Sequence, residues 1–313
     1  MVVLTMVLMR YAVLAPLIGK IGVVMANGDG KTVPMTLQFP WYNFVLLVAA
    51  TVFITAGGYV INDYFDIKTD LINKGKVIVG TKVPRRTAMM WHNILNILGV
   101  AIGFYISFRA GYFWLGTLFL VVSGLLYFYS ASYKRQFLIG NLVVAVLTGM
   151  VPMLVVFYEW PALYRYYTVN AVSLPNLNFI VYWIACFGCF AFLTNLIREI
   201  IKDIEDFEGD TAYGRNTVPV VIGILSAKIV TVCLIIITIL LLGLVWHFFV
   251  SDTISLIYLG TLVVLPLLFV IYQLLVTREN KQLHLASRVM KIIMITGVCY
   301  SLVVKIILTW NLF

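Results

Sequence analysis

The acidic residues of this chain are few and lie mainly in two short segments. Only 13 Asp and Glu occur among its 313 residues, and nine of them fall within residues 62–70 and 199–210. Both segments contain Asp-x2-Asp-x3-Asp, and each Asp of the second lies 140 residues after its counterpart in the first. Offsets of 0, 3 and 7 place three carboxylates on one face of a helix. We therefore expect two carboxylate stripes that could face each other across a cavity.

Such stripes favour a bound divalent cation. Stacked carboxylates repel one another, and near a membrane they are poorly solvated, so without a partner some would take up protons. Solvated helix ends are the alternative explanation, but acids near a helix C-terminus oppose the helix dipole. Magnesium prefers oxygen ligands and binds through one or two carboxylates together with phosphate oxygens. The pattern predicts an Mg2+ site, and its candidate ligands are Asn62, Asp63, Asp66, Asp70, Asp203, Asp206 and Asp210.

Basic residues lie close to both acidic segments. Carboxylates that bind a cation, mixed with Lys and Arg, indicate a magnesium-bridged diphosphate or triphosphate. No Gly-x4-Gly-Lys-Ser/Thr sequence occurs, so a P-loop nucleotide site is not expected. Membrane topology is the alternative explanation for any single basic residue. The candidate substrate-binding residues are Asn62, Lys74, Lys76, Tyr129, Lys134, Arg135, Arg198 and Lys202.

The elements that position these residues are predicted to be transmembrane helices. Hydrophobic residues make up 62% of the chain and charged ones 11%, with a mean hydropathy of +1.02, which a solvated surface could not carry. Long apolar runs without alternation favour helices over a barrel. We predict an all-α, polytopic membrane helix bundle that forms a single domain over residues 1–313. Its nine apolar stretches cover residues 2–26, 41–62, 89–108, 111–130, 138–158, 178–200, 217–249, 254–276 and 289–311.

The distribution of Lys and Arg predicts the orientation of the bundle. With nine spans, the connections 2/3, 4/5, 6/7 and 8/9 lie on one side, and they hold 16 of the 22 Lys and Arg. That side, which carries both acidic segments, is expected to be cytoplasmic in a bacterial or archaeal cell membrane. The net charge of +9 is spread over membrane loops, which favours anionic lipid or an anionic substrate as partner and excludes nucleic acid.

Taken together, these residues resemble the UbiA superfamily of intramembrane prenyltransferases over nearly the whole chain. The first aspartate motif (residues 62–70) fits that family's Asn-Asp-x2-Asp-x3-Asp, and the second aspartate motif (residues 203–210) fits its counterpart. Tyr129-Ser130, Lys134-Arg135 and Gly140-Asn141 are similar to the family's connection between helices 4 and 5. Residues 74–80 depart from the family, because they replace its commoner basic-Pro stretch.

The resemblance implies an activity for the two motifs. Members bind Mg2+ and a prenyl diphosphate there, which implies that Asp66, Asp70, Asp206 and Asp210 are catalytic and promote ionisation of the donor. The prenyl group would pass to a lipid-soluble acceptor, and no obligatory protein partner is inferred. The second motif's Lys-Asp-Ile-Glu-Asp-x2-Gly-Asp is most similar to the branch that contains geranylgeranylglycerol-phosphate geranylgeranyltransferases, which favours an isoprenoid glycerol phosphate as acceptor.

Other functions stay open at this point. Prenylation of an aromatic quinone precursor, such as hydroxybenzoate, dihydroxynaphthoate or homogentisate, is the alternative within the same family. A cation or phosphate transporter would also carry acids within the membrane, although transport sites usually lie near the bilayer midplane at broken helices. A scaffold without catalytic activity would not need two acidic stripes. A prenyltransferase therefore accounts best for acids clustered at helix ends beside basic residues.

Overall fold

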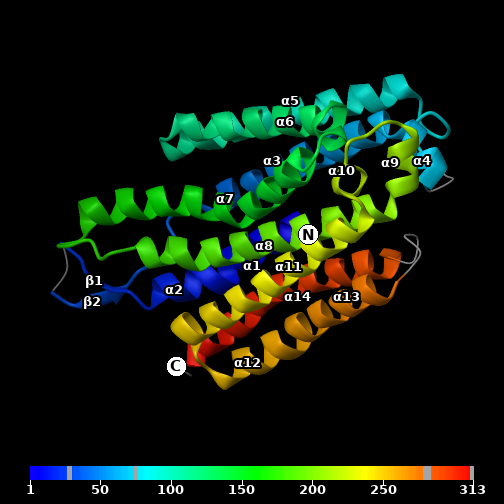
Figure 1. Ribbon diagram of the computed structural model, residues 1–313. Coiled ribbons are helices and arrows are strands. Elements are labelled where there is room, and N and C mark those ends of the chain that lie inside the picture. The colour runs from blue at the N-terminus through cyan, green and yellow to red at the C-terminus, as the bar shows by residue number, and fades with distance from the viewer. Residues whose placement is uncertain (27–29, 74–76, 278–282, 311–313) are drawn as a thin grey trace.

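A computed structural model describes residues 1–26, 30–73, 77–277 and 283–310. Within these ranges, nine helical segments are long and apolar enough to cross a membrane, which confirms the predicted architecture. They run side by side as one bundle (Figure 1). The first six segments are α1 (Val2–Leu8), η1 (Met9–Leu14) and α2 (Ala15–Gly19) together; α3 (Trp41–Phe65); α5 (Arg85–Ala110); η2 (Phe113–Leu115), α6 (Gly116–Ala131) and η3 (Tyr133–Arg135) together; α7 (Ile139–Asn170); and α8 (Asn178–Glu205). The last three are α11 (Ile224–Val245) with η4 (Trp246–Val250); α12 (Thr253–Leu259), η5 (Gly260–Val264) and α13 (Leu265–Val276) together; and α14 (His284–Trp310).

The first, fifth and seventh predicted stretches differ most in kind from the observed helices. The first helix ends at Gly19, and β-branched residues after it form strand β1 (Gly22–Val24), which pairs antiparallel with β2 (Thr32–Pro34). The fifth helix continues to residue 170, since neighbouring helices in a membrane bundle tolerate its two prolines. The seventh stretch is divided at Gly223, whose φ of +84° favours glycine. It separates the short helix α10 (Val218–Ile222) from α11.

Two further short helices extend the spans that carry the aspartate motifs. Helix α4 (Ile67–Asn73) follows α3, and α9 (Phe207–Ala212) follows α8. The two short helices contact each other at one end of the bundle, whereas the β1–β2 hairpin lies at the opposite end (Figure 1). Helix α3 packs against α5 and α6, and α8 packs against α7, α11 and α14. This packing brings the ends of the second and sixth spans together.

A buried ion pair holds the hairpin end. Arg10 of η1 lies 3.4 Å from Glu159 of α7, and the Arg10 guanidinium also donates to the carbonyl of Phe39 and lies 4.5 Å from the ring centre of Phe44. The Glu159 carboxylate accepts from the backbone N–H groups of Gln38 and Phe39 at 2.6 and 2.9 Å. These bonds satisfy backbone N–H and carbonyl groups of the loop before α3 and so fix the position of the chain where that helix begins.

Candidate active site

Each aspartate motif crosses a bend between a long helix and a short one. Asp66 lies between α3 and α4 with φ −91° and ψ 0°, and Asp206 lies between α8 and α9 with φ −89° and ψ 8°. The helical hydrogen bonding continues through the first bend, because the N–H of Asp66 donates to Asn62 at 3.0 Å and that of Asp70 donates to Asp66 at 2.8 Å. The helical spacing on which the predicted carboxylate stripe depends therefore continues through the bend.

The second motif has the same local geometry. The N–H of Asp206 donates to the carbonyl of Lys202 at 2.8 Å, and the N–H of Asp210 donates to that of Asp206 at 3.0 Å. The first aspartate of this motif, Asp203, accepts from Nδ2 of Asn141 on α7 at 2.7 Å. The second motif is thus tied to the neighbouring helix as well as to its own backbone.

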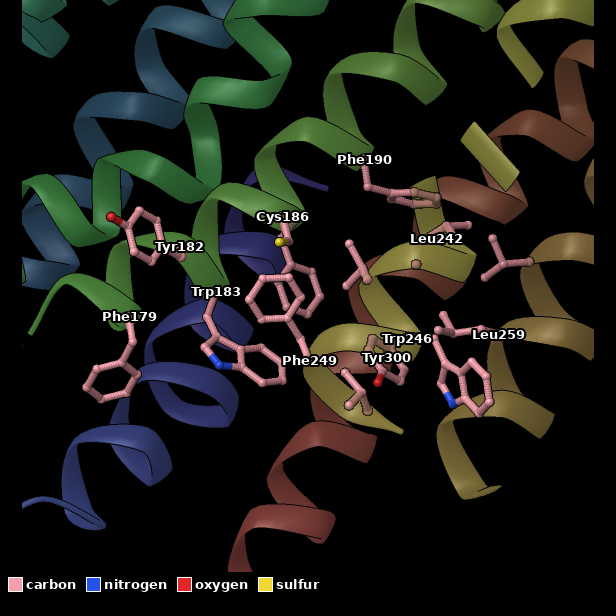
Figure 2. Close-up of a pocket in the computed structure, with 15 residues that line it drawn as sticks. Phe179, Tyr182, Trp183, Cys186, Phe190, Leu242, Trp246, Phe249, Leu259 and Tyr300 are labelled. Atoms are coloured by element: carbon pink, nitrogen blue, oxygen red, sulfur yellow. The ribbon is translucent and has the colours of Figure 1, made fainter. Parts of the chain in front are cut away.

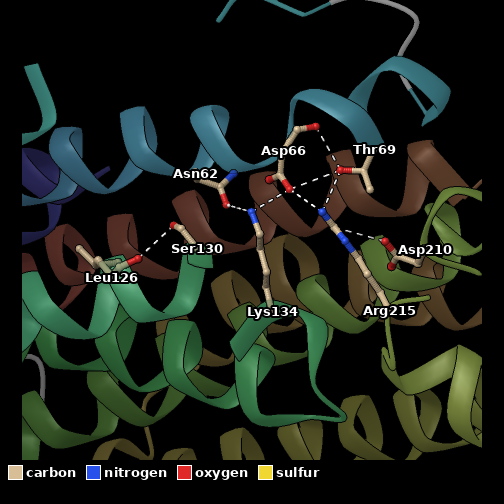
Figure 3. Close-up of polar contacts among 8 residues, drawn as sticks. All are labelled: Asn62, Asp66, Thr69, Leu126, Ser130, Lys134, Asp210 and Arg215. Carbon is tan, nitrogen blue, oxygen red and sulfur yellow. Dashed lines mark hydrogen bonds and ion pairs between the residues drawn. The ribbon is translucent and has the colours of Figure 1, made fainter. Parts of the chain in front are cut away.

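Arg215 joins the two aspartate motifs (Figure 3). Its Nη2 lies 2.8 Å from Oδ1 of Asp66, and its Nη1 lies 3.4 Å from Oδ1 of Asp210. Lys134 of η3 also contacts the first motif, with Nζ 2.7 Å from Oδ1 of Asp66. The same ammonium donates to Oδ1 of Asn62 at 3.1 Å. Three segments that are far apart in the sequence therefore meet at the Asp66 carboxylate.

The two carboxylates that contact Arg215 differ in their proton affinity. Burial disfavours the charged form of Asp66, but Lys134 and Arg215 outweigh burial and lower the pKa of that carboxyl below its usual value. Burial raises the pKa of Asp210, although Arg215 opposes this effect. The pKa of Arg215 is itself raised, since Asp66 and Asp210 outweigh its burial. Asp66 is consequently the more firmly ionised of the two carboxylates.

A cavity of about 580 Å³ leads from this end into the bundle. Its wall includes apolar side chains deep in the spans, such as Met9, Ile54, Phe119, Val151 and Phe187. The part of the cavity near the aspartate motifs is lined by polar side chains: Asn62, Tyr129, Asn195, Arg198, Glu199, Lys202 and Lys291. The arrangement suits an amphipathic ligand that has a charged head and a long apolar chain.

The sequence matches the UbiA prenyltransferase family over residues 33–295. The chain belongs to the UbiA prenyltransferase family. It is 32% identical to a digeranylgeranylglyceryl phosphate synthase from Methanosphaera stadtmanae over 256 residues, which cover 80% of this chain and 84% of that protein. As a family member with nine membrane-spanning helices in the described residues, it is an integral membrane prenyltransferase.

Solved structures of UbiA homologues share the fold. The apo homologue from Aeropyrum pernix K1 superimposes with a TM-score of 0.62 at 15% identity, covering 95% of this chain and 97% of that one. The homologue from Archaeoglobus fulgidus, bound to DMAPP and Mg2+, gives a TM-score of 0.57 at 18% identity, covering 98% of this chain and 96% of that one. The helical bundle described above is therefore the fold of a UbiA homologue.

The oxygen-rich residues of this UbiA protein fit magnesium that binds together with a phosphate ligand. Within the described ranges, no three His, Cys, Asp or Glu side chains are grouped closely enough to hold a metal ion between them. Asp66 and Asp210 nevertheless converge on one guanidinium, so two carboxylates from different helices face the same point. Magnesium typically takes only one or two protein carboxylates and completes its shell with phosphate oxygens and water. The donor set therefore suits a magnesium diphosphate.

Not every predicted site residue lies in this network. Asp63 and Arg135 have exposed side chains, although the backbone carbonyl of Arg135 accepts from the N–H of Asn216 at 2.9 Å. Lys74 and Lys76 lie outside the described residues. Arg198 and Lys202 line the cavity, where both contact Glu199. The members of the predicted set named so far thus lie in the Arg215 network, in the contact between Asn141 and Asp203, on the cavity wall, on the surface or outside the described residues.

Arg215 and Glu199 are site residues that the sequence motifs do not include. Arg215 follows Asp210 by five residues, so a search for bases just after each acidic segment would have found it. Glu199 was visible as an acid one turn before Asp203, but it lies outside the Asp-x2-Asp-x3-Asp spacing. Its carboxylate is buried and pairs with two neighbouring cations, which only the folded chain reveals.

A second, smaller cavity of about 110 Å³ lies between α8, η4, η5 and α14 (Figure 2). Aromatic side chains dominate its wall, among them Trp183, Phe190 and Trp246, and none of the residues that line it is charged. Phe187 and Phe190 line both cavities and therefore stand between them. The smaller cavity offers mainly apolar contact, and the titratable groups in its wall are the Cys186 thiol and the hydroxyls of Tyr182 and Tyr300.

Proposed function

We propose that this UbiA protein transfers a prenyl group from a prenyl diphosphate to the hydroxyl of an isoprenoid glycerol phosphate, giving an ether lipid. The observation that carries the proposal is the cavity of about 580 Å³, which joins a charged end beside the aspartate motifs to an apolar interior. The Methanosphaera stadtmanae relative, a digeranylgeranylglyceryl phosphate synthase, supports this acceptor class. Membrane lipid surrounds the protein, and the proposal requires no nucleic acid and no second protein.

The donor diphosphate would bind at the joined motifs. Asp66, Asp70, Asp206 and Asp210 are the proposed Mg2+ ligands, with Asn62, Asp63 and Asp203 as the further candidates. Lys134 and Arg215 already lie beside the first motif, so both can donate to phosphate oxygens. When bound, Mg2+ would neutralise the charge that develops on the leaving diphosphate. The homologue from Archaeoglobus fulgidus, which is bound to DMAPP and Mg2+, supports the proposal that Mg2+ takes part.

Transfer breaks the allylic carbon–oxygen bond of the donor, and the bonding electron pair leaves with the diphosphate. The acceptor hydroxyl oxygen forms the new carbon–oxygen bond, and its proton passes to the released diphosphate. Lys134 and Arg215 would stabilise the leaving group electrostatically. Apolar side chains in the deep part of the cavity would hold the prenyl chain and keep water from the allylic cation.

Removal of single acids tests the donor site. We expect Asp66→Ala and Asp206→Ala each to lower prenyl transfer at least a hundredfold while the protein stays folded, because each lies in a proposed metal site and not in the apolar core. Glu205→Ala is the matched control, since Glu205 directly precedes Asp206 but pairs with His284 at 2.8 Å. Activity is measured with radiolabelled geranylgeranyl diphosphate, with and without a magnesium chelator. Full activity of Asp66→Ala would contradict the assignment, as would full activity of the unaltered protein in the presence of the chelator.

The choice of acceptor is tested with the same purified protein. We expect an ether product from a glycerol phosphate acceptor and none from hydroxybenzoate, dihydroxynaphthoate or homogentisate. Chromatography of the lipid extract resolves these products. A prenylated aromatic product without any ether product would contradict the acceptor class but leave the prenyltransferase activity in place.

A further inference from the structure

The polar part of the large cavity is lined by two groups of side chains. Asn62, which contacts Lys134 beside Asp66, belongs to the group at the first aspartate motif. A second group of charged side chains belongs to α8 and α14, which pack against each other in the bundle (Figure 1). This second group, called the α8–α14 wall below, consists of Arg198, Glu199 and Lys202 on α8 and Lys291 on α14.

The α8–α14 wall carries an excess of positive charge. Glu199 is 7% exposed, and its carboxylate lies 2.6 Å from Nη1 of Arg198 and 3.0 Å from Nζ of Lys202. Lys291, from the second helix, adds a third cation to the same wall. Three cations against one carboxylate leave a net charge of +2 on this part of the cavity surface. Such a surface attracts a dianion.

Two hydrogen-bond donors on this wall have no partner among the described residues. They are Nδ2 of Asn195 and Nε of Arg198, both of which are buried. Asn195 is only 4% exposed and lines the cavity one helical turn before Glu199. A buried donor without an acceptor is costly, so such a pair in the wall of a cavity indicates a ligand rich in acceptor oxygens.

The α8–α14 wall differs chemically from the donor site. Two carboxylates, Asp66 and Asp210, converge at Arg215, which suits a metal-bridged diphosphate. Among the described residues of the α8–α14 wall, Glu199 supplies the one carboxylate, and two cations already engage it. Lys and Arg with few competing acids suit a phosphate monoester held by direct charge-assisted hydrogen bonds.

We propose that Asn195, Arg198, Lys202 and Lys291 form the binding site for the phosphate of the acceptor lipid. This inference rests on the proposed function, because it requires a phosphorylated acceptor. The sequence-based expectation already included Arg198 and Lys202 among the substrate-binding residues, together with Lys134 and Arg135, whereas Asn195 and Lys291 are added from the structure. Lys134 is held by Asp66 and Asn62, and the Arg135 side chain is exposed and does not line the cavity. In this proposal the acceptor phosphate binds beside the cations of α8 and α14 that line the cavity, and the donor diphosphate binds at the aspartate motifs, next to Asn62 of the same cavity.

Lys291→Gln tests the proposal with Lys305→Gln as its matched control. Both changes remove one positive charge from an exposed position of α14, but Lys305 does not line the cavity. We expect Lys291→Gln to raise the KM for geranylgeranylglycerol phosphate at least tenfold, because a charge-assisted contact is lost. The KM for geranylgeranyl diphosphate should change less than twofold. Lys291→Arg should restore most of the acceptor affinity, and Lys305→Gln should match the unaltered protein.

An acceptor without phosphate separates a binding role from a structural one. With geranylgeranylglycerol in place of its phosphate ester, we expect Lys291→Gln and the unaltered protein to have the same KM. Asn195→Ala should show the same dependence on the acceptor phosphate. The inference is overturned if Lys291→Gln raises both substrate KM values equally, changes neither, or acts equally on both acceptors. If the unaltered protein forms no ether product with either acceptor, the proposed function fails and the inference fails with it.

Discussion

At the scale of single residues, Arg215 determines how the two aspartate motifs meet. The contacts of its Nη1 and Nη2 with Asp210 and Asp66 use two arms of one planar group, which suits arginine better than lysine. Its side chain is 13% exposed, and that of Asp210 is 4% exposed. The cation therefore compensates carboxylate charge in a poorly solvated place, where an unpaired charge is costly.

Arg215→Ala tests this role. We expect a loss of about 1–3 kcal/mol in folding free energy, the usual cost of leaving a buried polar group without its partner, and at least a tenfold fall in prenyl transfer. Thermal unfolding in detergent and the transfer rate are the measurements. Arg215→Lys should recover stability in part, since it keeps the charge but cannot bridge both carboxylates equally well. Unchanged melting and activity in Arg215→Ala would refute a joining role.

At the scale of elements, close packing of α7 against α8 positions the second motif. A Cβ added to Gly149 would lie 2.8 Å from the carbonyl oxygen of Gly188, and one added to Gly188 would lie 2.9 Å from that of Gly149. Small residues allow such approach of helix backbones within membranes. The same helix pair is joined by the bond from Asn141 to Asp203. The glycine contact thus helps to keep the motif beside its partner helix.

Gly149→Val should force these two helices apart. We expect a loss of stability of about 1–3 kcal/mol, as for other overpacked interiors, together with reduced activity because the Asn141–Asp203 bond lengthens. Gly124→Val is the control: it places the same side chain in α6, where an added Cβ meets no atom within 4 Å. The melting temperatures of both variants decide the matter. If Gly149→Val melted no lower than Gly124→Val, the contact would have no part in stability.

At the scale of the whole molecule, both motifs lie at one end of the bundle and the β1–β2 hairpin lies at the other (Figure 1). The bias of Lys and Arg toward the motif end predicts that this end is cytoplasmic. The donor and acceptor of the proposed reaction would then enter from the cytoplasmic side of the membrane. This orientation remains a prediction that labelling can test.

Single cysteines introduced at opposite ends of the bundle report the orientation. Lys82→Cys lies at the motif end and Val172→Cys at the hairpin end, and both residues are exposed. The background lacks Cys186, Cys189, Cys233 and Cys299. We expect an impermeant thiol reagent to label Val172→Cys in intact cells and Lys82→Cys only after permeabilisation, because the motif loops are positively charged. The reverse pattern would contradict the cytoplasmic assignment of the motifs.

The sequence by itself determined the features that depend on local spacing and composition. Apolar length predicted nine spans, and recurrence at three and four residues placed the carboxylates of each motif along one helix face. The ends of the first, fifth and seventh stretches were misplaced, because strand pairing, packing around proline and the positive φ of Gly223 override hydropathy.

Only the tertiary structure decided which charges meet. Arg215 reaches Asp66 across 149 positions of sequence, and Arg10 reaches Glu159 at the other end of the bundle. Sequence spacing carries no information about such pairs, since the packing of whole helices sets which faces oppose each other. Packing likewise placed Lys291 of α14 beside the cations of α8 and left the Arg135 side chain on the surface. The aspartate motifs could therefore be predicted from the sequence, but the residues that line the cavity beside them could not.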